Sequence, residues 1–200
     1  MRASCWVRAA IAAAASIVAA GAAAGSLKPL DSRSFNALAW RAESQLQQQA
    51  AQVLRLEFHR GQGFAWRGEE GRHARVVSLR VQAEGQPAAC VLAFEQRGRL
   101  QLVDARAGDA EMPWACEGEP AMTLADVDRD GLSDLLVLYP YRAPSGAEFQ
   151  LPLVLRHRGE QAGVVTDEAR TQWLREPAQM HPPVQSVRQL KPLLQRYPRP

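Results

Sequence analysis

Hydrophobic and polar residues alternate through the middle of the chain, and this pattern predicts β-strands. The alternation is clearest over 54–58, 77–81 and 90–94. Successive side chains of a strand point to opposite faces of the sheet, so a period of two is typical of a strand with one buried face. These segments therefore predict a largely antiparallel sheet.

Glycine, proline and charged residues separate the predicted strands. A short turn at 96–98 predicts a hairpin between 89–95 and 99–104. The segment 61–71 is rich in glycine and charge, and 140–146 holds two prolines and a Ser-Gly pair. Both are interpreted as loops.

Helical spacing of apolar residues occurs near both ends of the chain. Asp31 can cap a helix over 33–51, where apolar residues recur near every third, fourth and seventh position. Thr166 is the expected N-cap of a short helix that continues through Glu176. Apolar residues in 187–194 predict one or two final helical turns despite an internal proline.

The continuous apolar run 135–139 predicts a strand that is buried on both faces. A further strand is expected at 149–157. The fold class that follows is α+β, with a mainly antiparallel β-sheet, an N-terminal amphipathic helix and short C-terminal helices. We expect one domain over 25–200, because the chain has a single loop of the kind described below rather than a repeat.

The N-terminal segment 1–24 is typical of a secretory signal peptide. Arg2 and Arg8 precede or flank an Ala-rich apolar stretch that ends in small residues. That stretch is short and weakly hydrophobic for a membrane span, although an uncleaved anchor is the alternative. The expected location is therefore periplasmic or secreted, with no membrane span after cleavage.

The net charge of the chain gives no indication of a nucleic-acid partner. The sequence contains 24 Lys and Arg against 21 Asp and Glu, and loss of the two arginines in 1–24 leaves the two signs nearly balanced. A nearly neutral protein has no electrostatic reason to bind nucleic acid.

Two cysteines, Cys90 and Cys116, remain after the predicted cleavage. A pair in an exported protein favours a disulfide, which by the chain-entropy model would contribute about 3 kcal/mol. The alternative is two independent buried thiols.

The strongest chemical signal is an acidic loop just before the apolar run. Aspartates occupy loop positions 1, 3, 5 and 9, and Gly131 at position 6 permits a sharp bend. Alternate residues of a tight loop point inward, so the spacing predicts oxygen ligands for Ca²⁺. The backbone carbonyl of Leu132 would supply a further ligand. The predicted metal ligands are Asp126, Asp128, Asp130, Leu132 and Asp134.

The loop is not a complete EF-hand, because Val137 stands where the bidentate glutamate would be and no helices flank it. It resembles the calcium-loop element of FG-GAP and VCBS-type repeats, in which an Asp- and Gly-containing loop precedes an apolar strand. The residues that carry this resemblance are Asp126, Asp128, Asp130, Gly131 and Asp134. The resemblance implies calcium binding and a β-rich domain. The alternative is a solvated acidic turn.

No catalytic constellation emerges from the sequence. The four histidines are scattered and are expected at the surface or in hairpins, and Ser145 is not in a nucleophile elbow. Glu69 and Glu70 could act as paired acids, but a solvated pair is the simpler interpretation. Three aromatic residues could stack on a sugar or belong to the core: Phe64, Trp66 and Trp114.

The functional expectation is an exported calcium-binding interaction module of the bacterial envelope, not an enzyme, with a structural calcium ion and a protein partner. Its specific form would be an inhibitor or immunity protein acting on a cell-wall hydrolase, by analogy with exported proteins that carry this kind of loop. The alternatives are a calcium-stabilised extracytoplasmic hydrolase and a structural component of the envelope.

Overall fold

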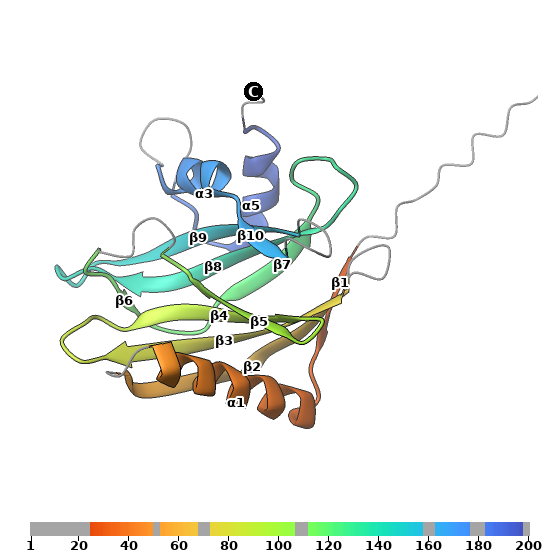
Figure 1. The fold of residues 1–200 in the computed structure, drawn as a ribbon. Helices are drawn as coiled ribbons and strands as arrows, with labels where there is room; N and C mark the ends of the chain where they lie inside the picture. Colours follow the sequence, from red (N-terminus) through yellow and green to blue (C-terminus); the bar gives the residue numbers. More distant parts are fainter. Residues whose placement is uncertain are drawn as a thin grey trace, which may run out of the picture.

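Two antiparallel five-stranded sheets stack face to face, with helices on both outer faces (Figure 1). This computed structural model describes residues 25–49, 53–67, 73–106, 112–157, 163–176 and 183–197. The predicted fold class is confirmed: the chain is mainly antiparallel β-sheet with an N-terminal helix and short C-terminal helices. The predicted signal peptide 1–24 and the pair Glu69 and Glu70 lie outside the described residues.

The first sheet, sheet A, is a meander in which neighbouring strands follow one another along the chain. Its strands, in spatial order, are β1 (Ser26–Pro29), β2 (Val53–Arg67), β3 (His73–Ala83), β4 (Ala89–Gln96) and β5 (Arg99–Asp104). The predicted hairpin is present, since Gln96 pairs with Arg99 and the turn between them has positive φ at Arg97 and Gly98.

Helix α1 (Ser32–Gln49) covers the outer face of sheet A. The predicted cap is confirmed, because the Ser34 N–H donates to Asp31 Oδ1 at 2.8 Å. An apolar stripe of the helix packs on the sheet, as its spacing predicted. The buried residues of this stripe are Phe35, Leu38, Ala39 and Ala42.

The second sheet, sheet B, is built around β8 (Asp134–Arg142) and β9 (Glu148–His157). Strand β10 (Val164–Thr166) pairs with the outer edge of β9. On its other side β8 pairs with two short strands in turn, β7 (Ala121–Ala125) and β6 (Ala115–Cys116). Helices α3 (Glu168–Arg175) and α5 (Val187–Leu194) cover the outer face of this sheet.

Strand β8 is buried on both faces, as the apolar run predicted. Leu135, Val137 and Tyr139 belong to the core between the sheets. Leu136 and Leu138 belong to the core beneath α3 and α5. The strand therefore takes part in two hydrophobic cores, and the loop that leads into it is anchored to the centre of the molecule.

The predicted disulfide between Cys90 and Cys116 is present, with Cα atoms 5.3 Å apart. Cys90 lies in β4 of sheet A and Cys116 in β6 of sheet B, and both are fully buried. The bond therefore joins the two sheets directly, and it does so at the end of the sandwich where β4 starts and β8 finishes.

Strand β2 is longer than the sequence predicted, because residues 61–67 belong to it rather than to a loop. Its pairing with β3 breaks between Phe58 and Gly63 and then resumes. At Gly63 an added Cβ would collide with the Phe35 ring, so this glycine allows close packing of α1 instead of marking a turn. Composition alone cannot distinguish these two uses of glycine.

Two further boundaries differ from the prediction. Residues 140–142, predicted as loop, belong to β8, and Pro140 lies where the strand partner changes from β7 to β6. The N-cap of α3 is Asp167 rather than Thr166, because Asp167 Oδ1 accepts the Arg170 N–H at 3.1 Å. Thr166 is the last residue of β10.

Candidate metal site

The acidic loop connects β7 to β8 and folds through its own aspartates. Asp126 Oδ2 accepts the Gly131 N–H at 3.1 Å, and Asp130 Oδ1 accepts the Leu132 N–H at 2.8 Å. Asp128 Oδ1 accepts the Asp130 N–H at 3.2 Å. Such side-chain to backbone bonds are how aspartate stabilises tight turns. Gly131 has a φ of 84°, a positive value that glycine adopts at little cost. This conformation provides the sharp bend that was predicted at loop position 6.

Three of the predicted ligands come together. Carboxylate oxygens of Asp126, Asp128 and Asp130 all lie within 4.8 Å of one another, which is close enough to hold a metal ion. Oxygen clusters of this kind suit hard cations such as Ca²⁺. The group is partly exposed to solvent, so an ion could reach it without opening of the fold.

The predicted ligand Asp134 is not part of that group of three. Asp134 is only 2 % exposed, and its Oδ2 accepts the Val127 N–H at 3.1 Å across the neck of the loop. Burial, together with the charges of Asp130, Asp126 and Asp167, raises the pKa of Asp134 to about 7. Leu132 is half-buried and contributes its N–H to Asp130, while its carbonyl as a ligand stays a prediction.

A cation from another strand also reaches the loop. The Arg156 guanidinium of β9 forms an ion pair with Asp128 and lies 3.7 Å from Asp130 Oδ2. Its other terminal nitrogen is 3.8 Å from Asp167 Oδ2, at the start of α3. Arginine therefore supplies counter-charge to the carboxylates that the sequence assigned to calcium. Only the antiparallel pairing of Leu135 with Leu155 could have indicated this neighbour.

A buried chain of polar side chains, not evident from the sequence, links His59, Ser78 and Tyr139. His59, expected at the surface, is only 6 % exposed. Its Nδ1 lies 3.0 Å from Ser78 Oγ, which in turn is 2.9 Å from the Tyr139 hydroxyl. Burial lowers the pKa of His59 and raises that of Tyr139.

This Ser–His contact is not arranged for nucleophilic catalysis. Ser78 and Tyr139 are both fully buried, so the Ser78 hydroxyl cannot meet a substrate. The chain instead links β2 and β3 of sheet A to β8 of sheet B. Of the other histidines, His73 is exposed, whereas His181 and the side chain of His157 are outside the described part.

The aromatic residues considered as a stacking surface belong to the core. Trp66 is 1 % exposed between the sheets, and Phe64 packs against the same cluster. Trp114 meets Phe149 edge to face, with ring centroids 5.1 Å apart. Within the part of the chain that is described, no helix is long and apolar enough to cross a membrane.

No protein-family model, curated protein or solved structure matches this chain. The resemblance of the loop to calcium-binding repeats therefore depends on its own residues.

Proposed function

We propose that this protein is an exported calcium-binding interaction module of the bacterial envelope, and that its calcium ion is structural. The observation that carries the proposal is the convergence of Asp126, Asp128 and Asp130 carboxylates within 4.8 Å. A disulfide between the sheets is consistent with an oxidising compartment outside the cytoplasm.

A bound ion would act as a clamp at the entry to β8. The loop is closed by bonds from its aspartates to its own N–H groups, and the strand that follows is packed into two cores. An ion bound there would hold the loop in the conformation that starts this strand. The loop lacks the twelfth-position carboxylate of a sensor site, which favours a structural role over a switch.

Calcium binding has to compete with Arg156, which already neutralises Asp128 and Asp130. The guanidinium can shift toward Asp167, whose Oδ2 is 3.8 Å from it. Because the ion must displace this cation, we propose an affinity in the range of extracellular modules, with Kd on the order of 10⁻⁴–10⁻³ M.

The test is the calcium dependence of the melting temperature of the purified protein. Calcium at about 100 times Kd should stabilise it by about 2.7 kcal/mol. Asp128→Asn should abolish this shift, while the matched control Glu84→Gln, an exposed acid in the β3–β4 turn, should retain it. A protein that shows no shift at about 100 times the weakest Kd of this range, on the order of 100 mM calcium, would refute the metal site.

A second variant separates a metal site from a loop that is permanently neutralised by arginine. Arg156→Gln removes the competing cation, so it should lower the melting temperature in chelator and increase the calcium-dependent shift. If Arg156→Gln lowers stability and calcium restores nothing, the acidic loop is an arginine-paired turn.

For the interaction role, we propose a protein partner in the envelope, in its specific form a cell-wall hydrolase that this protein inhibits. That form is supported only by the resemblance of the loop to exported proteins. Affinity purification with and without chelator, followed by an assay of peptidoglycan hydrolysis with the recovered partner, tests it. Turnover of peptidoglycan by this protein alone would favour the hydrolase alternative, and sedimentation with cell walls would favour a structural component.

A further inference from the structure

Arginines gather at one end of sheet A, around the turn between β4 and β5. We call this region the basic end, and define it as Arg41, Arg67, Arg75, Arg97 and Arg99. These residues come from α1, from β2, β3 and β5, and from the turn itself. Because the chain as a whole carries a formal charge of only +3, this grouping is a local feature and not a general excess of positive charge.

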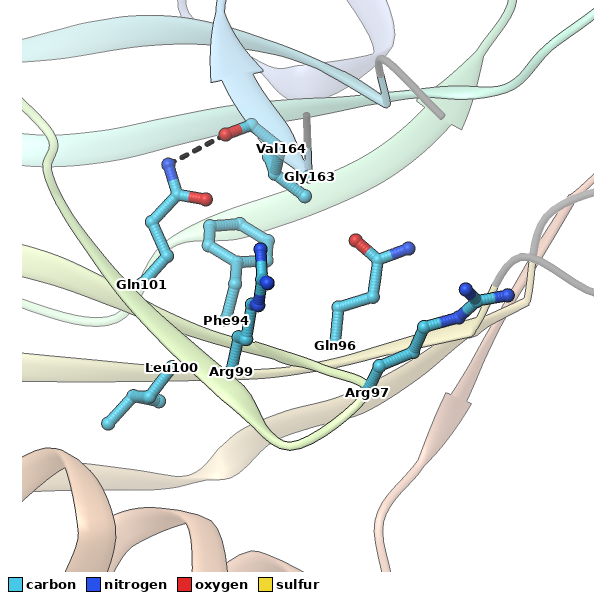
Figure 2. A pocket seen from close by; sticks show the side chains of 8 residues that line it. All are labelled: Phe94, Gln96, Arg97, Arg99, Leu100, Gln101, Gly163 and Val164. Carbon is cyan, nitrogen blue, oxygen red and sulfur yellow. Dashed lines mark hydrogen bonds between the residues drawn. The ribbon is translucent and has the colours of Figure 1, made fainter. Parts of the chain in front are cut away.

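Two hollows open at the basic end, one on each face of the sheet. The larger, of about 760 Å³, lies between the hairpin and the start of β10 and is lined by Arg97, Arg99, Gln96 and Gln101. Figure 2 shows Gln96, Arg99 and Gln101 directed toward Gly163 and Val164, with Phe94 behind them. The smaller, of about 580 Å³, is lined by Arg67, His73, Arg75 and Arg97.

One acidic residue, Glu95, is found among the described residues that line the two hollows. It is 6 % exposed and forms ion pairs with both Arg41 and Arg75. Arg41 also donates to the Gly98 carbonyl at 2.6 Å, which fixes its guanidinium beside the turn. Among the described residues of the basic end, one carboxylate is thus shared by two guanidiniums, and the other arginines add further positive charge.

Arg67 and Arg99 have no ion pair within the described part of the chain. A guanidinium presents its donors in a planar fork that matches a carboxylate, and it has no acceptor with which to satisfy itself. The basic end is therefore chemically complementary to an anionic ligand.

We propose that the basic end and the adjoining edge strand β5 form a docking surface for an extended, acidic segment of a protein partner. This deepens the proposed function by assigning the chemistry of the partner, but it does not require the metal loop. Strand β5 is one of the two edge strands of sheet A, and among the described strands only β4 pairs with it. A polypeptide can add to such an edge through main-chain hydrogen bonds.

The register of β5 determines which partner side chains would fit. Gln101 pairs with Phe94 and Arg99 with Gln96, so Arg99 and Gln101 face the larger hollow. Leu100 and Leu102 face the opposite side and are half-buried against the α1 core. A peptide beside β5 would place alternate side chains on these two faces. Acidic residues would meet Arg99, and the apolar residues between them would cover the leucines.

The probe that follows is a short labelled peptide in which Glu and Val alternate, titrated against the purified protein in chelator. Two controls are a peptide of the same composition with all Glu before all Val, and a polyphosphate of similar charge. The alternating peptide should bind about tenfold more tightly than the block peptide, and raising the salt concentration should weaken its binding.

Charge-neutralising variants locate the site. Arg99→Gln should weaken binding of the alternating peptide by about fivefold, whereas Arg67→Gln, on β2 and in the smaller hollow on the other face, should weaken it less. The matched control Arg188→Gln removes an exposed arginine from α5, on the far side of sheet B, and should leave binding unchanged. Melting curves of all three variants check that they fold.

The chelator separates this test from that of the metal, so a failure of calcium binding would not affect it. Equal affinity for the alternating and block peptides would overturn the docking of an extended strand. Tighter binding of polyphosphate than of the alternating peptide would overturn the assignment of a protein partner. Binding that is unchanged in Arg99→Gln would overturn the location.

Discussion

The acidic loop of sheet B and the basic end of sheet A lie at the same end of the sandwich. They differ in where their charged side chains find hydrogen-bond partners. The two regions are close in space, since the Gly25 N–H donates to Ser133 Oγ in the acidic loop at 2.9 Å and Gly25 lies next to the Arg67 carbonyl. The hairpin is tied to sheet B by Gln101, which donates to the Val164 carbonyl at 2.7 Å. Figure 1 shows both turns at this end.

The difference follows from the length and chemistry of the side chains. An aspartate is short and only accepts hydrogen bonds when ionised, so the carboxylates of the loop can use its own N–H groups. An arginine is long and only donates, and Arg99 projects into a hollow rather than onto its own backbone. The carboxylates of the acidic loop are thus satisfied by the loop itself and by Arg156 of β9, while Arg99 at the basic end has no ion pair among the described residues.

The largest effect is expected from a change that should leave both regions intact. Replacing both cysteines (Cys90→Ala with Cys116→Ala) should cost about 3 kcal/mol of unfolding free energy, because the bond constrains the unfolded chain. Denaturant titration measures the loss. The bond lies at the opposite end of the sandwich, so the calcium shift and peptide binding should persist at temperatures where the variant is folded. Loss of either one would show that the charged end depends on the disulfide.

The next largest effect concerns Asp134, which closes the neck of the acidic loop and is distinct from the three clustered carboxylates. Asp134→Ala should cost about 1–3 kcal/mol, because it leaves the Val127 N–H without its acceptor. Asp134→Asn keeps an acceptor and removes a charge that burial disfavours, so in chelator above pH 7 it should be more stable than the alanine variant. Chemical denaturation of the two variants makes the comparison. Equal losses would mean that the bond at the neck contributes little.

At the basic end, one substitution should move stability and binding in opposite directions. Glu95→Gln removes the buried partner of Arg41 and Arg75 and should cost about 1–2 kcal/mol, a value reduced because both arginines are more than a third exposed. It also removes the negative charge of the smaller hollow, so affinity for the alternating acidic peptide should rise. Thermal melts and peptide titration on one sample test both signs. Weaker binding would mean that Glu95 is needed to position the arginines.

The features predicted from sequence are those that depend on neighbours along the chain. The hairpin of β4 and β5, the cap at Asp31 and the apolar spacing of α1 all depend on local patterns, and the structure contains each of them. The cluster of Asp126, Asp128 and Asp130 was predictable for the same reason, because a tight loop brings alternate residues together.

The features that were missed depend on contacts between distant segments. Arg156 meets the acidic loop only because β9 pairs with β8. His59 was assigned to the surface because nothing near it in sequence reveals Ser78 and Tyr139, which reach it from other strands. The arginines of the basic end likewise come from α1 and several strands of sheet A. They are not clustered along the sequence, so the sequence alone does not predict this region.

The smallest expected effect is the pH dependence of stability in mild acid. We expect it to involve the buried His59, and the measurement also tests whether either charged region contributes to it. Burial lowers the pKa of His59 below its ordinary value of 6.5, against the opposing charges of Glu119 and Glu57. As the pH falls below 6.5, the unfolded chain therefore takes up a proton that the folded protein resists, and the contribution of His59 to stability falls by at most about 1.4 kcal/mol per pH unit. The raised pKa of Asp134 acts in the opposite direction over the same range, so the effect of His59 is the difference between the wild type and a His59 variant. His59→Asn keeps a hydrogen-bonding group near Ser78 and should remove the His59 contribution to this slope in denaturation curves measured across the range. Asp128→Asn and Arg99→Gln should retain the slope, because neither residue contacts His59.

If Asp128→Asn flattens the slope instead, protonation of the acidic loop controls stability in acid. The carboxylates of that loop would then be less completely satisfied by its backbone N–H groups than the hydrogen bonds indicate.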